Sequence, residues 1–256
     1  MIHETAIVDA SARVAADVEI GPYSVIGAGV EIGAGSVIGP HVVIMGPSKI
    51  GRDNRIFQFS SIGEAPQDKK YQGEPSLLEL GDRNVIREYV TLNRGTDMGH
   101  GKTVIGSDNL FMAYSHVAHD CIVGSHTIFA NAASVSGHVE VGDYATLGGF
   151  TSVHQFTQIG SRAFCGLGSI VTQDIPPFST AAGNRARVIG INKEGLKRRG
   201  FSPEVIRALH KSFRELLKSR GSKEEAFANL EPLCKKYPEV EEFVDFVRNS
   251  KRGIAT

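Results

Sequence analysis

An aliphatic residue stands at every sixth position over the first 62 residues of the chain, eleven times in succession. These positions are Ile2, Val8, Val14, Ile20, Ile26, Ile32, Ile38, Ile44, Ile50, Ile56 and Ile62. The register resumes from Leu80 to Leu92 and again from Ile105 to Val171. A period of six fits neither an amphipathic helix nor a simple hairpin meander. A β-sandwich, the competing fold, would show strands every 8 to 12 residues with strict alternation of apolar and polar residues. The period of six predicts short strands separated by turns, with each aliphatic side chain pointing inward.

Three such strands make one triangular coil of about 18 residues, and stacked coils make a parallel β-helix. Glycine often follows the inward aliphatic residue, as at Gly21, Gly27 and Gly33. We expect these glycines to free the corners from Cβ clashes. No coil can bury its inward face alone, so the stack is expected to be stabilised cooperatively.

The repeat is interrupted twice, at 63–79 and 93–104, and we expect two loops extruded from corners of the helix. Long loops in a compact repeat usually act as lids or binding arms, although surface decoration is the simpler alternative. After residue 190 the pattern becomes helical. Ser202 and Ser222 are expected N-caps, and Pro203 and Pro238 are expected in first turns. The sequence thus predicts a repeat domain over 1–190 and a helical domain over 191–256.

Composition excludes several classes of protein. Lys and Arg number 28, as do Asp and Glu, so no net charge attracts nucleic acid or an anionic membrane. No apolar run approaches the ~20 residues of a membrane-spanning helix. The three cysteines, Cys121, Cys165 and Cys234, fit neither a zinc motif nor a disulfide framework. We therefore expect a protein of the reducing cytoplasm.

Histidines gather around the second half of the repeat. His116 and His119 flank the inward Val117, and His138 follows 19 residues after His119, which is about one coil. His154 comes one coil later still. Three interpretations compete: a zinc site like that of gamma-class carbonic anhydrases, a general base that takes a proton from a hydroxyl, and polar corner residues without a role.

Several motifs carry a resemblance to a known family: "SHVAHD" at 115–120, "SGHV" at 136–139, "SVHQF" at 152–156 and "INKEGLKRRGFS" at 191–202. Together with the repeat, they make the whole chain similar to the UDP-N-acetylglucosamine acyltransferase family. The resemblance implies a left-handed parallel β-helix of hexapeptide repeats with a C-terminal α-helical domain. It also implies transfer of a 3-hydroxyacyl group from acyl carrier protein to the 3-hydroxyl of UDP-N-acetylglucosamine, the first step of lipid A biosynthesis.

By this resemblance, His119 is the general base, Gly137 gives its N–H to the oxyanion, and Asp120 supports the base. Because Asp120 is adjacent to His119 in the chain, we expect it to act through the field of the site rather than through a direct bond. The resemblance implies further substrate-binding residues: Asp68, Lys70, His116, His138, His154, Gln155, Leu167, Asn192, Glu194, Arg198 and Arg199. It implies no metal and no cofactor, and a homotrimer with active sites between subunits.

Two positions depart from the family pattern. Asn93 stands where the family usually has histidine, which keeps open a 3-amino sugar nucleotide as the acceptor. Leu167 lies at the position that measures acyl chain length, where a bulky side chain implies a chain of ten to twelve carbons. Outside this family, a metalloenzyme of the gamma-class carbonic anhydrase type is the alternative, although it explains neither the helical domain nor the loops.

Overall fold

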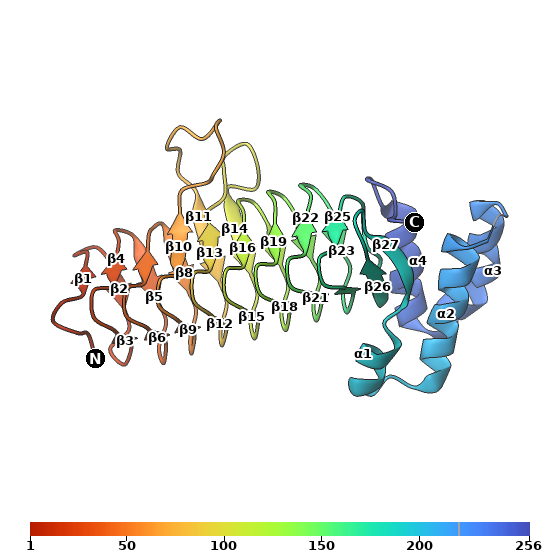
Figure 1. Cartoon of the computed structure of the whole chain (residues 1–256), viewed down its shortest axis with the longest axis horizontal. Coiled ribbons are helices and arrows are strands. Elements are labelled where there is room, and N and C mark those ends of the chain that lie inside the picture. Colours follow the sequence, from red (N-terminus) through yellow and green to blue (C-terminus); the bar gives the residue numbers. More distant parts are fainter. Residues whose placement is uncertain (220) are drawn as a thin grey trace.

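The computed structural model describes residues 1–219 and 221–256. Short strands form three sheets along a long prism, and helices lie at its C-terminal end (Figure 1). Nearly all strands pair in parallel with the strand three further along the chain, so Val117 lies opposite Val135 and Val135 opposite Val153. This 18-residue register is the triangular coil that the period of six predicts. The last two strands of the third sheet are the exception, because they are consecutive in the chain and pair antiparallel.

The strands of each sheet follow one another along the prism. The first sheet contains β1 (Ile7–Val8), β4 (Val25–Ile26), β7 (Val43–Ile44), β10 (Ser61–Glu64), β13 (Thr91–Asn93), β16 (His116–Val117), β19 (Ser134–Val135), β22 (Ser152–Val153) and β25 (Ile170–Val171). The second contains β2 (Arg13–Val14), β5 (Val30–Ile32), β8 (Ser48–Ile50), β11 (Leu77–Leu80), β14 (Lys102–Ile105), β17 (Ile122–Val123), β20 (Glu140–Val141) and β23 (Gln158–Ile159). The third contains β3 (Glu19–Ile20), β6 (Val37–Ile38), β9 (Arg55–Ile56), β12 (Val85–Ile86), β15 (Leu110–Phe111), β18 (Ile128–Phe129), β21 (Thr146–Leu147), β24 (Phe164–Cys165), β26 (Ser179–Ala182) and β27 (Arg187–Ile191).

The inward positions of the repeat form the core of the prism. From Ile20 to Val171, every side chain in the six-residue register is at most 3% exposed. The first three positions differ, because Ile2 is 48% exposed and Val8 and Val14 are only partly buried. The first coil has a neighbouring coil on one side only, so its inward side chains lack half of their packing partners.

The glycines after the inward residues are needed for close approach between coils. A Cβ on Gly21 would lie 2.7 Å from the nitrogen of Pro40, and one on Gly33 would lie 2.7 Å from the carbonyl oxygen of Gly51. The left-handed corner residue is mostly a different one, such as Tyr23 (φ 58°) or Asp120 (φ 58°). The predicted clash is therefore confirmed, but the corner conformation itself is carried mainly by aromatic, acidic and histidine residues.

Two loops, 65–76 and 94–101, project from the same edge of the prism (Figure 1). Each connects a strand of the first sheet to a strand of the second, β10 to β11 and β13 to β14. The predicted bounds, 63–79 and 93–104, were too wide. Leu77 already pairs with Lys102, and Leu78 is fully buried at an inward position that a period of six does not reveal.

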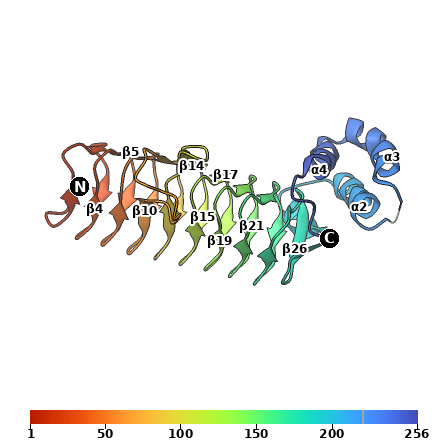
Figure 2. The same cartoon turned by 90° about the horizontal axis from the view of Figure 1, so that it is seen from above.

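In the described part of the chain after the repeat there are four helices: α1 (Lys193–Arg198), α2 (Pro203–Leu217), α3 (Lys223–Lys236) and α4 (Pro238–Asn249). The predicted caps are confirmed, since the side chains of Ser202 and Ser222 accept hydrogen bonds from the N–H groups of Val205 and Glu225. The buried stripe of α2 packs against α3, α4 and β27 (Figure 2). Among the described residues, no helix is both long and apolar enough to cross a membrane.

Candidate active site

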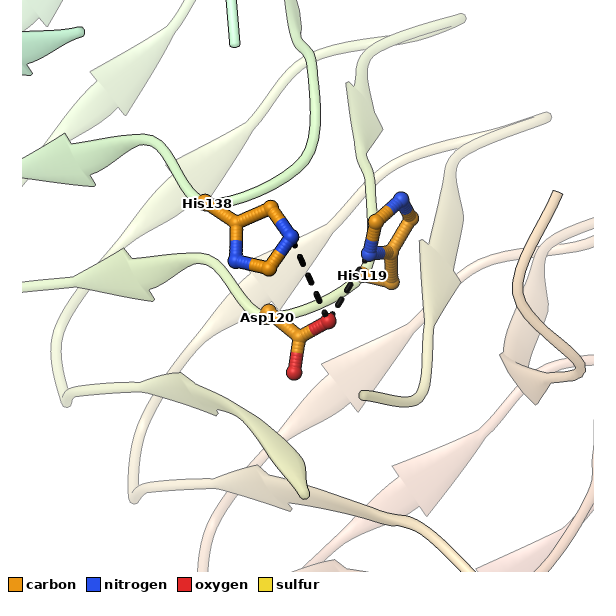
Figure 3. A group of neighbouring side chains, drawn as sticks. All are labelled: His119, Asp120 and His138. Carbon is orange, nitrogen blue, oxygen red and sulfur yellow. Dashed lines mark hydrogen bonds and ion pairs between the residues drawn. The ribbon is translucent and has the colours of Figure 1, made fainter. Parts of the chain in front are cut away.

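One edge of the prism, between the first and second sheets, carries both loops and three of the nine histidines, His119, His138 and His154. We call it the histidine edge; it comprises residues 118–121, 136–139, 154–157 and 172–174, one group from each of four successive coils. His119 and His138 approach one another there, with ring centroids 5.2 Å apart (Figure 3). Stacking of coils thus brings together residues that lie 19 positions apart in the chain.

A direct hydrogen bond joins the two most central residues of this edge. The Nδ1 atom of His119 lies 2.8 Å from Oδ2 of Asp120 (Figure 3). The expectation that Asp120 acts only through the field of the site was therefore wrong. The left-handed conformation of Asp120 turns its carboxylate back toward the preceding side chain, which an extended backbone would not allow.

The carboxylate of Asp120 is fully buried and anchors the second loop. It accepts hydrogen bonds from the N–H and the hydroxyl of Thr96, the latter at 2.7 Å, and from the N–H of His100 at 2.9 Å. Burial would raise the pKa of this carboxyl, but the hydrogen bonds from His119, Thr96 and His100 outweigh burial and lower it. Asp120 is therefore an ionised, fixed acceptor for the Nδ1–H of His119.

Gly137 leaves space for the His119 ring. A Cβ at Gly137 would lie 2.6 Å from Cε1 and 2.7 Å from Nε2 of His119. The carbonyl of Gly137 accepts a hydrogen bond from the Phe156 N–H, whereas its own N–H has no acceptor within residues 1–219 and 221–256. Gly137, which packs closely against the His119 ring, therefore has an N–H that no described residue uses.

His138 and His116 flank this pair. The His138 ring stacks on Phe156 with centroids 4.5 Å apart, and Nδ1 of His116 lies 2.7 Å from the Thr91 hydroxyl. Burial lowers the pKa of both histidines, and it outweighs the hydrogen bond with Thr91 that raises the pKa of His116 and the Asp120 charge that raises the pKa of His138. Both imidazoles are therefore neutral near pH 7.

His119, Asp120 and His138 also offer three donor atoms within 4.8 Å of one another, a spacing that could hold a metal ion. A metal at these atoms would have to replace the hydrogen bond between His119 and Asp120. The Asp120 oxygens would remain occupied by donors from the second loop. The donor set suits a hydrogen-bonded base at least as well as a metal centre.

A cavity of about 540 Å³ opens beside these residues and contains the predicted loop pair, Asp68 and Lys70. The Asp68 carboxylate accepts a hydrogen bond from the backbone N–H of Lys70, and this bond shapes the tip of the first loop. Asn93 fixes the base of this loop, because its amide donates to the carbonyls of Glu64 and Ala65. The departure at Asn93 thus has a structural role between the two loops.

The predicted nucleotide residues lie elsewhere on the prism. Asn192, Glu194, Arg198 and Arg199 line a second cavity of about 870 Å³, over the third sheet and α1. Asn192 caps α1 by accepting the Gly195 N–H. The helix ends at these arginines, as a run of cations before Gly200 predicts, and Gly200 has φ 80°.

Leu167 lies on a third part of the prism, at the edge between the third and first sheets, and is 77% exposed. His154 and Gln155 are exposed on the histidine edge. One chain therefore brings together His119, Asp120, Gly137 and His138, with His116, Asp68 and Lys70 near them. Leu167 lies at the edge between the third and first sheets. Asn192 lies over the third sheet and α1, together with Glu194, Arg198 and Arg199.

Comparison with known proteins identifies the family. Residues 174–255 match the family model for domain 2 of UDP N-acetylglucosamine O-acyltransferase, and residues 1–34 and 102–137 match the bacterial transferase hexapeptide repeat. A relative from Thiobacillus denitrificans, named acyl-[acyl-carrier-protein]–UDP-N-acetylglucosamine O-acyltransferase, is 55% identical over 99% of this chain and 98% of its own. A relative of the same name from Pseudomonas paraeruginosa is 49% identical with the same coverage.

Solved structures agree with the sequence relatives. The structure of LpxA from Acinetobacter baumannii has a TM-score of 0.97 and 44% identity, covering 100% of this chain and 99% of that one. The LpxA of Bacteroides fragilis, a UDP-N-acetylglucosamine acyltransferase, has a TM-score of 0.97 and 38% identity, and each chain is covered completely. This chain belongs to the UDP-N-acetylglucosamine acyltransferase family.

Membership of the UDP-N-acetylglucosamine acyltransferase family confirms that the chain is an acyltransferase. It also confirms the predicted left-handed parallel β-helix of hexapeptide repeats with C-terminal helices. The comparisons favour this family over the gamma-class carbonic anhydrase alternative.

Three residues near this site were not predicted from the sequence. Thr96 and His100 hold Asp120 from the second loop, and Arg252 of the C-terminal tail approaches His154 with Nη2 3.3 Å from Nδ1. Thr96 lies three residues after Asn93, the position that departs from the family pattern. His100 and Arg252 carry no local signal, because their contacts depend on the path of a loop and of the tail.

Proposed function

We propose that this chain transfers a 3-hydroxyacyl group from acyl carrier protein to the 3-hydroxyl of UDP-N-acetylglucosamine, the first step of lipid A biosynthesis. Its relatives carry this donor and acceptor in their names. We place the chain in the cytoplasm, where acyl carrier protein and UDP-N-acetylglucosamine would be available to it. The three cysteines form no disulfide in the structure, which agrees with a reducing compartment.

The hydrogen bond between His119 and Asp120 carries this proposal. An ionised Asp120 accepts only, so the proton of neutral His119 is held on Nδ1 and Nε2 is the free base. Nε2 takes the proton of the sugar hydroxyl as its oxygen attacks the thioester carbonyl. The tetrahedral intermediate then collapses, the C–S bond breaks, and the thiolate recovers the proton from His119. The products are the sugar ester and the free carrier thiol.

The backbone at Gly137 supplies the stabilising contact for this step. Its N–H is unused by the described residues and lies next to the His119 ring. In our proposal, it donates to the oxyanion of the tetrahedral intermediate. His116 and His138 stay neutral near pH 7 and can donate or accept hydrogen bonds to the sugar without a charge that repels His119.

The separation of the predicted residues supports a trimer with shared sites. The histidine edge and the cavity that contains Arg198 and Arg199 lie on different sides of one prism. In a threefold assembly, the histidine edge of one subunit can face the third sheet of the next. Arg198 and Arg199 of one subunit then bind the pyrophosphate through bidentate hydrogen bonds from their guanidinium groups. His119 of the neighbouring subunit acts on the sugar of the same nucleotide.

In the same arrangement, the 3-hydroxyacyl chain lies between His154 and Gln155 of one subunit and Leu167 of another. Leu167 is exposed on its own chain, so it is available to close the end of such a pocket. We propose that it limits the chain to ten to twelve carbons. Replacement of Leu167 by Gly should shift the preference to longer chains, and an unchanged preference would contradict this assignment.

The test is acyl transfer to UDP-N-acetylglucosamine from 3-hydroxyacyl carrier proteins of ten to fourteen carbons. Wild type should form the ester, and His119→Ala should lose about 10²–10⁴-fold in rate, as expected for a missing general base. His41→Ala is the matched control, because His41 is an exposed histidine that stacks on Tyr23 and Phe59 at another edge. Product from a 3-amino sugar nucleotide and none from the hydroxyl acceptor would overturn the proposed acceptor.

A further inference from the structure

A stack of side chains runs along the edge of the prism between the second and third sheets. His126, Tyr144 and Arg162 occupy equivalent left-handed corners of three successive coils, with φ of 59°, 61° and 61°. The rings of His126 and Tyr144 lie 4.6 Å apart at an interplanar angle of 5°, and Cζ of Arg162 lies 5.2 Å from the centroid of the Tyr144 ring. The neighbouring coils therefore hold the Tyr144 ring between two side chains.

Arg199, at the C-terminal end of α1, contacts the same ring. Its Cζ atom lies 4.2 Å from the Tyr144 centroid, within the range of a cation–π interaction. Within residues 1–219 and 221–256, no carboxylate oxygen lies within 4.0 Å of the Arg199 guanidinium, and this group donates no hydrogen bond. A guanidinium that stacks on a ring still presents N–H groups in its own plane, where a phosphate can accept them.

The same edge also fastens the two ends of α1. Before the helix, the Asn192 side chain donates a hydrogen bond from Nδ2 to the carbonyl of Arg162 at 3.1 Å. After the helix, the ring of Phe201 lies 5.6 Å from Cζ of Arg162, which is equally far from the ring of Phe178. The position of Arg199 relative to the prism is therefore fixed on both sides along the chain.

Tyr144 and Arg199 line the cavity of about 870 Å³ that also contains Asn192, Glu194 and Arg198. Tyr144 is partly buried there, and its hydroxyl has no hydrogen-bond partner among the described residues. The ring alone therefore holds Arg199. A carboxylate could also hold this arginine, but it would compete with a phosphate for the same N–H groups. An aromatic ring avoids that competition, because it contacts the cation through its π system.

We propose that Tyr144 is a positioning residue for nucleotide binding, because it holds the Arg199 guanidinium ready for the pyrophosphate of UDP-N-acetylglucosamine. The proposal rests on the proposed function, in which Arg199 is a nucleotide contact. A free arginine side chain loses rotamer freedom when it binds an anion, whereas a stacked one has lost much of that freedom beforehand. Tyr144 is therefore expected to raise the affinity for the nucleotide and to leave the rate of acyl transfer unchanged.

The test measures the binding of UDP-N-acetylglucosamine by calorimetry, together with KM and kcat for acyl transfer. Tyr144→Leu should bind the nucleotide about 3- to 30-fold more weakly, the range of one cation–π contact. Its KM should rise in parallel while kcat stays at the wild-type value, because the lost interaction is the same in the ground and transition states. Tyr144→Phe keeps the ring and should restore the affinity to within about 2-fold of wild type.

A double-mutant cycle with Arg199→Gln separates positioning from a general structural role. In the Arg199→Gln background, Tyr144→Leu should cause no further loss of affinity, since the tyrosine acts through the arginine. An equal loss in both backgrounds, or wild-type affinity in Tyr144→Leu, would overturn the proposal.

Tyr23→Leu is the matched control, because Tyr23 has the same left-handed conformation and stacks on His41, but at the edge between the third and first sheets. It should keep the wild-type affinity. Absence of both nucleotide binding and acyl transfer in wild type would instead refute the proposed function.

Discussion

At the scale of single residues, the position of the His119 ring depends on how little space surrounds it. A Cβ at position 137 would overlap the ring, so this position requires glycine. On the opposite side of the ring, Asp120 holds Nδ1 through a hydrogen bond. The sequence alone indicated these three residues through a resemblance. The structure adds the reason why each residue type is needed.

Replacing Gly137 by Ala should displace the His119 ring without unfolding the protein. The new Cβ would overlap Cε1 and Nε2, and a shift of about 1 Å in a catalytic group costs roughly 10²-fold in kcat. The control is Gly190→Ala, where a Cβ meets nothing within 4 Å. Steady-state kinetics together with the thermal unfolding midpoint would check this. Full activity in Gly137→Ala would show that His119 does not act from this position.

Replacing Asp120 by Asn should make the free energy of unfolding less dependent on pH in the acidic range. The pKa of Asp120 is lowered in the folded protein, so its carboxylate stabilises the fold above its ordinary pKa of about 3.9. This stability is lost as the pH falls through the lower, folded value. Urea unfolding between pH 3 and pH 7 should show Asp120→Asn less stable by about 1–3 kcal/mol at neutral pH, with a gap that narrows below pH 4.

Asp245→Asn is the control for this series, since its carboxylate is half exposed on α4. It should change stability by less than about 0.5 kcal/mol at any pH in the series. A gap between wild type and Asp120→Asn that stays constant down to pH 3 would contradict the assignment of an ionised, hydrogen-bonded Asp120.

At the scale of elements, the second loop is a support for the catalytic pair. Thr96 and His100 reach Asp120 from loop 94–101, and Asn93 ties the base of the first loop to the second. Both loops leave the prism at one edge (Figure 1), the edge between the first and second sheets. His119 lies at the same edge, between β16 and β17. The loops therefore position the base as well as forming walls of the cavity.

Thr96→Val should weaken this support while leaving the fold intact. It removes the hydroxyl hydrogen bond to Asp120, and about a 10-fold loss in kcat is expected for one charge-assisted bond. Thr103→Val is a matched control in β14, because the buried hydroxyl of Thr103 has no hydrogen-bond partner among the residues that the structure describes. The control should be neutral or slightly stabilising in urea unfolding. Equal activity of both variants would mean that Thr96 plays no part in catalysis.

At the scale of the whole molecule, stacking of coils places distant residues side by side. This is why the period of six predicted so much of the fold: the inward residues from Ile20 to Val171, the three faces and the position of the loops. The exposed first coil was not predicted, because a repeat pattern gives no information on how many neighbours a coil has. The corner residues were missed because glycine was expected to carry their conformation.

The candidate site was predictable only in part for the same reason. His119 and His138 lie one coil apart, so the repeat places them together. Thr96, His100 and Arg252 reach the edge through a loop and a tail that follow no repeat. The Leu167 and Asn192 groups lie on other faces, where one chain gives no contact with His119.

The most direct test of the account is a complementation measurement. His119→Ala lacks the base, and the double variant Arg198→Ala with Arg199→Ala lacks the proposed nucleotide contacts; each homogeneous protein should be inactive. If the two are co-expressed in equal amounts, random threefold assembly gives one interface in four an intact His119 facing an intact arginine pair. Acyl transfer should therefore recover to about a quarter of wild type, and no recovery in mixed assemblies of proven composition would contradict a base shared with the neighbouring subunit.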